Sequence, residues 1–211
     1  MSKVDEVWLK YAPNEEARQQ LFNRLWHRQF KLLKNLGVSH PKLMFCMGGI
    51  PGSGKTTLAE QVEQRFKGIR LSNHELRLIL DDLLPGSQTA EHNIIIGAYE
   101  PYMLEQVSSL PNGFLIVDSG IERKYRQFFA WAKAHYYQLV TVDFEVPKQE
   151  AEERIKQTRS KPEPFLAEMD RWWAEHEAFQ RSVKADFVLK PNDSFEPVLG
   201  KIKELLNAQA R

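Results

Sequence analysis

The chain has 211 residues, which is enough for one domain with a sizeable buried core. Its 29 Lys and Arg nearly balance 28 Asp and Glu, so net charge supplies no long-range attraction to nucleic acid or to an anionic membrane. A single cysteine, Cys46, excludes an internal disulfide and fits a core position in a reducing compartment. No run of about 18 apolar residues predicts a membrane span, and no apolar signal segment follows Met1, so we expect a cytoplasmic location.

The N-terminal segment predicts one long amphipathic helix over about 15–36. Asn14 is a suitable N-cap, Glu15 and Glu16 fit the first turn, and Gly37 marks the end. One face is broadly apolar and is expected to pack on the rest of the chain. The other face is either ordinary solvated surface or a contact for a partner or for nucleic acid, and we assign it no function. Its basic residues are Arg18, Arg24, Arg28, Lys31 and Lys34.

Residues 49–56 read Gly-Ile-Pro-Gly-Ser-Gly-Lys-Thr and stand between the apolar run 43–48 and a helical segment that ends near residue 66. This is the phosphate-binding loop pattern in its strand–loop–helix setting. Lys55 would face the β- and γ-phosphates of a nucleotide, and the hydroxyl of Thr56 would bind magnesium. The alternative is a glycine-rich turn that only joins a strand to a helix, which the Lys and Thr in register disfavour. The expected nucleotide-binding residues are Pro51, Gly52, Ser53, Gly54, Lys55, Thr56 and Thr57.

Strands alternate with helices along the whole chain, which predicts a three-layer α/β fold with a five-stranded parallel sheet. We expect residues 1–40 to form an N-terminal helical extension and residues 41–211 to form the domain itself. The expected strands are 43–48, 69–71, 114–117, 139–146 and 185–189. The expected helices are 57–66, 74–84, 90–110 with a bend at Pro101, 122–134, 148–159, an aromatic-rich segment around Trp172 and Trp173, and a last helix capped by Ser194.

Two further segments carry candidate chemistry. Asp118 directly follows the apolar strand 114–117, which is where P-loop enzymes place a magnesium-organising carboxylate, although a turn residue or helix cap also fits. Residues 72–75 have the Ser-x-x-Glu form of a capping box, so His74 and Glu75 fall in the first turn of a helix. Arg77 lies three residues after His74 and therefore on the same face.

In this order, the motifs resemble those of the small-molecule and polynucleotide kinases of the P-loop superfamily, in particular the zeta-toxin-like branch, over about 43–206. The segment from Ser72 to Arg77 is similar to the one in which these kinases carry a proton-accepting Asp and a phosphate-binding Arg. Asp118-Ser119-Gly120 resembles their Asp-x-Thr element, and residues 144–159 resemble the strand that leads into their arginine-bearing lid. The stretch 185–189, with Asn192 after it, resembles the one that flanks the nucleotide base.

The resemblance implies a kinase that uses ATP or GTP with Mg²⁺ held by Thr56 and Asp118. It implies that Arg154 and Arg159 cover the transferring phosphoryl group; the less favoured alternative is surface ion pairing with nearby carboxylates such as Glu150. It assigns acceptor binding to Arg77 and Arg123. One departure stands out, because His74 occupies the place of the expected Asp. The proton acceptor therefore stays open among His74, Glu75 and Asp118.

Three functions remain in competition. The first is a kinase acting on a hydroxyl of a small molecule such as a nucleoside or sugar nucleotide. The second is a polynucleotide 5′-hydroxyl kinase, which the even balance of charge over residues 151–181 disfavours. The third is a nucleotide switch or NTPase coupled to a partner, for which the basic face of the N-terminal helix is the one supporting feature.

Overall fold

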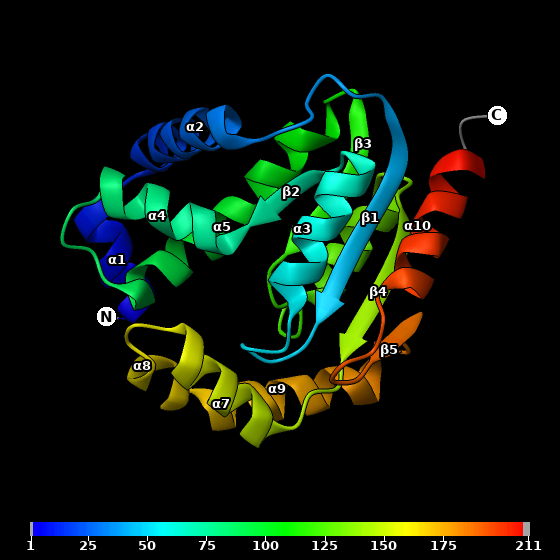
Figure 1. Cartoon of the computed structure of the whole chain (residues 1–211). Helices are drawn as coiled ribbons and strands as arrows, with labels where there is room; N and C mark the ends of the chain where they lie inside the picture. The colour runs from blue at the N-terminus through cyan, green and yellow to red at the C-terminus, as the bar shows by residue number, and fades with distance from the viewer. Residues whose placement is uncertain (1, 209–211) are drawn as a thin grey trace. The chain divides into compact units, whose positions relative to one another are not determined.

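Five short strands that are apolar along most of their length form the centre of the fold. The computed structural model describes residues 2–208. The strands are β1 His40–Gly48, β2 Ile69–Ser72, β3 Asn112–Asp118, β4 Gln138–Phe144 and β5 Phe187–Leu189. They form one sheet in the order β2-β3-β1-β4-β5, and β1 pairs in parallel with both β3 and β4 (Figure 1). This confirms the predicted fold class, because parallel neighbours require the helical crossovers that the sequence pattern supplies.

The helices alternate with these strands after two helices at the N-terminus. The first five are α1 Lys3–Tyr11, α2 Glu15–Leu32, α3 Lys55–Phe66, α4 Asn73–Leu83 and α5 Thr89–Ser108. The remaining five are α6 Tyr125–Ala134, α7 Lys148–Thr158, α8 Glu163–Leu166, α9 Met169–Ser182 and α10 Glu196–Ala208. Within residues 2–208, no helix has the length and apolar character needed to cross a membrane.

The chain divides into two compact units, each described below by itself. The helical unit comprises the residues up to 34 together with 72–110, and the sheet unit comprises 35–71 together with the residues from 111 onward. The predicted division of the sequence at residue 40 stays a prediction.

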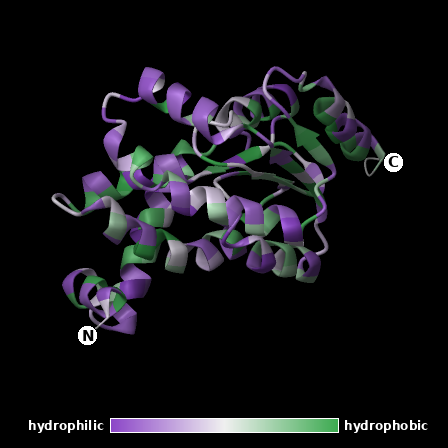
Figure 2. Cartoon of the chain, turned by 90° about the horizontal axis from the view of Figure 1, so that it is seen from below, coloured by the Kyte–Doolittle hydropathy of each residue, from purple (hydrophilic) through white to green (hydrophobic). Residues whose placement is uncertain are grey.

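One face of the sheet is covered by α3 and α10, which run alongside β1 and β4 in Figure 1. Leu43, Phe45 and Met47 alternate along β1 toward this face, and all three are buried in one core with residues of α3 and α10. The helix that ends beside the C label in Figure 2 shows both hydropathy colours along its length. That pattern follows from its single apolar stripe, formed by Val198, Leu199, Ile202, Leu205 and Leu206.

The opposite face of the sheet packs against α6 and α9. Asp143 of β4 is in register with Gly48 of β1, and it accepts hydrogen bonds from His176 Nε2 at 2.6 Å and Gln180 Nε2 at 2.8 Å. A Cβ atom at residue 48 would lie 2.5 Å from the Phe179 ring, so glycine is what allows α9 to approach the strand end. The sheet unit thus has helices on both faces.

The helical unit is held by α1, α2, α4 and α5. Tyr99 is fully buried, and its hydroxyl donates to Gln29 Oε1 at 2.8 Å, which satisfies a buried amide on α2. Phe22 packs edge-on against the same tyrosine ring at 5.6 Å between centroids. At the end of α1, Tyr11 donates to Glu91 Oε2 of α5 at 2.9 Å.

Several predicted boundaries are wrong by a few residues. The first long helix ends at Leu32 rather than near 36, because Leu33 is extended and Asn35 has a positive φ of 63°. The strand predicted as 114–117 is 112–118, since Asn112 pairs with His40 and extends the strand ladder. The helix predicted from 122 begins at Tyr125, and the strands predicted as 139–146 and 185–189 are 138–144 and 187–189.

The predicted capping box at residues 72–75 is also wrong. Ser72 is the N-cap of α4, but its side chain makes no capping hydrogen bond. Capping boxes occur instead at Ser2 with Asp5 and at Gln88 with Glu91. The first of these starts α1, a helix that was not predicted.

Candidate active site

The loop between β1 and α3 has the backbone that phosphate binding requires. Gly49, Gly52 and Gly54 have φ values of 139°, 84° and 108°, which side chains with a Cβ rarely adopt. A Cβ at residue 52 would also lie 2.7 Å from the carbonyl oxygen of Ala151, so α7 approaches the loop closely. The predicted nucleotide loop is therefore formed as a turn of glycines at the N-terminus of a helix, where backbone N–H groups collect.

Lys55 is the first residue of α3, and its side chain is turned back into the loop. Its Nζ donates to the carbonyl oxygens of Gly49 and Ile50, the second at 2.9 Å, and to Ser53 Oγ at 3.3 Å. Burial lowers the pKa of Lys55, while the charges of Glu122, Asp118 and Asp143 oppose that shift. The charges of three carboxylates therefore act on Lys55, the residue expected to contact the β- and γ-phosphates.

Thr56 and Asp118 meet beside the loop. Thr56 Oγ1 donates to Asp118 Oδ1 at 3.0 Å, and Asp118 is buried at the end of β3. Arg70 of β2 donates from Nη1 to the other oxygen, Oδ2, at 2.7 Å, and its Nε lies 3.3 Å from Glu63 Oε2 of α3. The sequence reasoning missed Arg70, because one arginine in a short strand carries no motif.

The Thr56 and Asp118 oxygens fit a magnesium ion. Mg²⁺ prefers oxygen ligands, keeps several waters and takes the rest of its shell from substrate phosphates rather than from an all-protein cage. Residues 2–208 contain no cluster of three or more His, Cys, Asp or Glu side chains that could hold a metal ion. The two predicted ligands therefore supply a partial set of the kind that a nucleotide-bound Mg²⁺ completes.

Of the two predicted lid arginines, one contacts the loop. Arg154 of α7 donates from Nη1 to the carbonyl oxygen of Gly52 at 3.3 Å and from Nη2 to Glu150 Oε1 at 2.5 Å. Arg154 therefore forms both the ion pair with Glu150, which was the alternative interpretation, and a contact with the loop. Arg159, just after α7, lies over the Phe165 ring at 5.0 Å and forms no ion pair within residues 2–208.

Two further carboxylates near the loop were missed by the sequence reasoning. Glu122 Oε1 accepts a hydrogen bond from the Gly49 backbone N–H at 2.6 Å. Asp143 is buried at the end of β4 with His176 and Gln180 as donors. A signal existed for Asp143, since it lies near the carboxyl end of an apolar strand, as Asp118 does. No sequence pattern marked Glu122, because it stands in an irregular turn.

His74, Glu75 and Arg77 belong to the helical unit, so their geometry is given there alone. His74 is exposed in the first turn of α4 and makes no side-chain hydrogen bond in the described part of the chain. Arg77 donates from Nη2 to Asn93 Oδ1 of α5 at 3.0 Å. Their predicted roles in acceptor chemistry stay predictions.

Arg123 and Asn192 lie within the sheet unit. Arg123 Nε is 3.3 Å from Glu175 Oε2 of α9, which ties the predicted acceptor-binding arginine to a carboxylate. Asn192 is exposed in the turn after β5 with a positive φ of 70°, a conformation that asparagine tolerates well. Among the other loop residues Ser53 is buried, Pro51 is half-buried and Thr57 is exposed.

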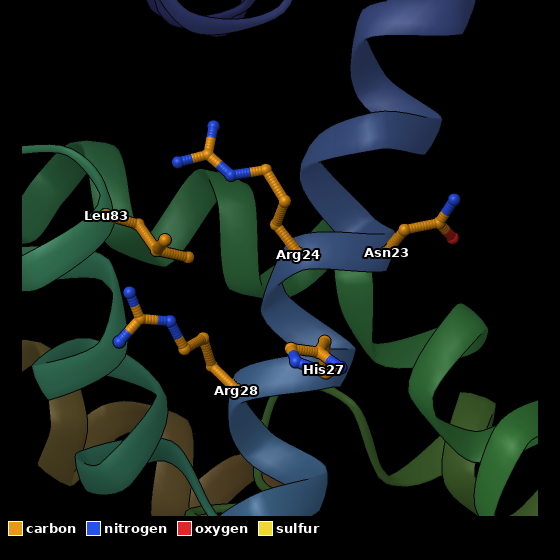
Figure 3. A pocket seen from close by; sticks show the side chains of 5 residues that line it. All are labelled: Asn23, Arg24, His27, Arg28 and Leu83. Carbon is orange, nitrogen blue, oxygen red and sulfur yellow. The ribbon is translucent and has the colours of Figure 1, made fainter.

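The basic face of α2 borders a shallow pocket of about 290 Å³ in the helical unit. Figure 3 shows Arg24 and Arg28 extending from α2 on the side of Leu83 of α4, with His27 and Asn23 on the adjoining part of the same helix. Arg28 Nη1 lies 3.0 Å from Asp82 Oδ2, and both side chains are more than half exposed. These features agree with a solvated surface, and no function is assigned to the pocket.

A glycine loop between a parallel strand and a helix, with a Thr–Asp pair beside it, defines a P-loop nucleotide-binding fold. The chain belongs to the family described as AAA domain, whose model matches residues 44–182, well over half of the chain. No curated protein matches it in sequence.

Three solved structures share the fold. A candidate kinase from Chloroflexus aurantiacus J-10-fl has a TM-score of 0.54 at 11% identity, with 80% of this chain and 98% of the other covered. The APS kinase CysC of Mycobacterium tuberculosis has a TM-score of 0.50 at 18% identity, with 80% and 99% covered. The tunicamycin resistance protein of Deinococcus radiodurans has a TM-score of 0.50 at 18% identity, with 81% and 96% covered. At these identities the likeness concerns the fold.

Proposed function

We propose that the protein is a P-loop kinase that transfers the γ-phosphoryl group of ATP or GTP to a hydroxyl group of a small molecule. The observation that carries this proposal is the contact of Arg154 with the loop, from Nη1 to the Gly52 carbonyl oxygen at 3.3 Å. An arginine beside the γ-phosphate position neutralises charge that builds up during transfer. Such an arginine serves transfer to an acceptor and hydrolysis alike, so the acceptor assay below separates the two reactions.

The chain's own residues divide the work of such a transfer. The glycine loop binds the phosphates through backbone N–H groups, and Lys55 exchanges its contacts with Gly49 and Ile50 for phosphate oxygens. Thr56 and Asp118 would hold Mg²⁺, which neutralises phosphate charge when bound. Closure of α7 over the loop would bring Arg154 onto the transferring group and exclude water, which favours transfer over hydrolysis.

The choice of a small-molecule acceptor has support from the fold and from charge. The structurally similar APS kinase is known in complex with AMPPNP and APS, that is, with a small acceptor bound. The charge of the present chain is nearly balanced, which gives a nucleic-acid backbone little general attraction. The nucleoside or sugar-nucleotide class remains the predicted acceptor.

The test is a transfer assay with radiolabelled ATP or GTP and a panel of adenosine, uridine, glucose, UDP-glucose and a 5′-hydroxyl oligonucleotide. We expect label on one of the small molecules. Label on the oligonucleotide alone would make the protein a polynucleotide kinase. Phosphate release without labelling of any acceptor would make it an NTPase and reject the proposal.

Lys55→Ala should lower the rate of transfer by at least about 10²-fold, since it removes a preorganised positive charge from the phosphate site. Lys203→Ala, on the exposed side of α10, is the matched control and should leave the rate unchanged. Circular dichroism of both variants checks that the fold is retained. Full activity of Lys55→Ala would contradict the assignment of the loop.

A further inference from the structure

The carboxylate that sequence motifs place nearest to the phosphates is poorly suited to accept a proton. Both oxygens of Asp118 already accept hydrogen bonds, Oδ1 from Thr56 at 3.0 Å and Oδ2 from Arg70 at 2.7 Å. Each oxygen is thus engaged by a donor, and Oδ1 lies at the expected magnesium position, so Asp118 has no free oxygen to offer to an acceptor hydroxyl. Among the carboxylates that lie at the loop, a residue other than Asp118 is therefore better placed to accept the proton.

Within residues 2–208, Glu122 differs from Asp118 in that only one of its two carboxylate oxygens accepts a hydrogen bond. Its Oε1 accepts the Gly49 N–H at 2.6 Å, which fixes the carboxylate against the first residue of the phosphate loop. Its Oε2 accepts no hydrogen bond in the described part of the chain. That oxygen lies 2.5 Å from where a Cβ of residue 120 would stand, so Gly120 leaves room for the carboxylate to fold over the backbone.

The charge of Glu122 also acts on the phosphate-binding lysine. Among the three carboxylates that raise the pKa of Lys55 against the effect of burial, Glu122 acts most strongly, ahead of Asp118 and Asp143. Glu122 and Lys55 contact the same loop residue, since Glu122 Oε1 accepts the Gly49 N–H and Lys55 Nζ donates to the Gly49 carbonyl oxygen. A hydroxyl that approaches a γ-phosphorus held by Lys55 would thus come near this carboxylate. Half-buried and in contact with the loop, Glu122 is within the site rather than at its rim.

We propose that Glu122 is the general base of the transfer reaction. The acceptor oxygen forms a bond to the γ-phosphorus while the bond from that phosphorus to the β,γ-bridging oxygen breaks. The hydroxyl proton passes to Glu122 Oε2, and the nucleoside diphosphate leaves with the electron pair of the broken bond. This assignment rests on the proposed kinase function and adds the residue that takes the proton.

Glu122→Gln is the informative variant, because glutamine keeps an oxygen that can accept the Gly49 N–H but takes up no proton. With radiolabelled ATP and the labelled member of the acceptor panel, kcat should fall by about 10²-fold or more. The KM for ATP and the affinity for AMPPNP should stay within about threefold, given that the loop contact is retained. The acidic limb of the pH profile of kcat should disappear, and Glu122→Asp should recover part of the rate.

Gly120→Ala provides a second variant, since the new Cβ would push the carboxylate away from its place while Glu122 itself remains. We expect kcat to fall by a similar factor, again without loss of AMPPNP binding. Glu163→Gln, an exposed carboxylate on α8, is the matched control and should behave as the wild type.

The outcomes separate this inference from the proposed function. If the wild type labels an acceptor and Glu122→Gln keeps both its kcat and its pH profile, the base assignment is overturned and the kinase function stands. If Glu122→Gln loses AMPPNP affinity and keeps kcat, the residue only shapes the loop, which also overturns the assignment. If the wild type labels no acceptor, the proposed function fails and the base assignment with it.

Discussion

Arg70 is the residue whose removal should cost the sheet unit most stability among its charged side chains. It lies between Asp118 and Glu63, and all three side chains are at most 13% exposed. Taking away the shared cation leaves Glu63 and Asp118, both buried, without their common ion-pair partner, so Arg70→Ala should lower the free energy of unfolding by about 3 kcal/mol. Urea denaturation followed by circular dichroism measures the change.

Arg65→Ala is the comparison for that experiment. Arg65 pairs with Glu196 at 2.9 Å, but the two side chains are 47% and 67% exposed. An exposed pair contributes at most about 1 kcal/mol. Equal losses in the two variants would show that the Arg70 cluster has no special weight.

His92 should make the helical unit sensitive to acid. It is buried on α5 with its Nε2 2.5 Å from Ser87 Oγ, and burial lowers its pKa, partly offset by Asp81. Because the folded state then binds fewer protons than the unfolded state, the stability it contributes is present above the ordinary pKa of about 6.5 and is lost as the pH falls through the lower folded value.

The measurement is the urea midpoint of the wild type, His92→Gln and His27→Gln at about pH 7.5 and about pH 5.5. The acid-induced drop should be smaller in His92→Gln than in the wild type. His27 is exposed on α2, so its variant should follow the wild type. A drop of the same size in all three proteins would exclude His92 as its source.

Site residues were predictable where a local pattern carries them and not where packing brings them together. Lys55, Thr56 and Asp118 follow from an eight-residue motif and from a strand end. Arg70 and Glu122 reach the same place from β2 and from a turn after β3, and neither position has a sequence signature. Contacts of this kind depend on the order of strands in the sheet, which single-residue spacing does not encode.

At the scale of elements, substitutions at the N-cap residues of helices measure how much each capping side chain contributes to the free energy of unfolding. Asn14 Oδ1 accepts the Ala17 N–H at 2.8 Å, so Asn14→Ala should cost about 1 kcal/mol of unfolding free energy. Ser72 holds the same position at α4 without a capping hydrogen bond, so Ser72→Ala should cost clearly less in urea denaturation. A larger cost for Ser72→Ala would mean that its hydroxyl has a partner beyond the helix end.

The same comparison explains which elements could be predicted. The central strands β1, β3 and β4 are short and apolar, and the sequence located them within a few residues. The Ser-x-x-Glu pattern at residues 72–75 stands at a helix start but forms no capping box, so the pattern located the helix and not the side-chain contacts. Helix α1 was not predicted, because its capping box pairs Ser2 with Asp5 instead of the usual Glu.

At the scale of the whole molecule, the two units mark the limit of prediction from sequence order. Alternating strands and helices predict one layered sheet, and the sheet unit has it. Nothing in the order of elements indicated that α1 and α2 pack with α4 and α5 into a unit of their own. That grouping joins segments separated by the whole of β1 and α3, so it follows from long-range packing.

The single thiol reports on whether the sheet unit opens. Cys46 lies in the middle of the central strand, in register with Val117 on one side and Thr141 on the other, and is fully buried. Burial also raises the pKa of its thiol, which suppresses the reactive thiolate. A thiol reagent can therefore attack Cys46 only after the sheet separates.

Labelling of native protein by a disulfide reagent should thus be at least about 10³-fold slower than labelling of an exposed thiol, because domains of ordinary stability open this rarely. Ser39→Cys combined with Cys46→Ala supplies the exposed thiol for comparison. In urea the Cys46 rate should rise in step with loss of the sheet signal in circular dichroism. Fast labelling in the absence of urea would place Cys46 outside a stable core and would contradict the packing of β1 between β3 and β4.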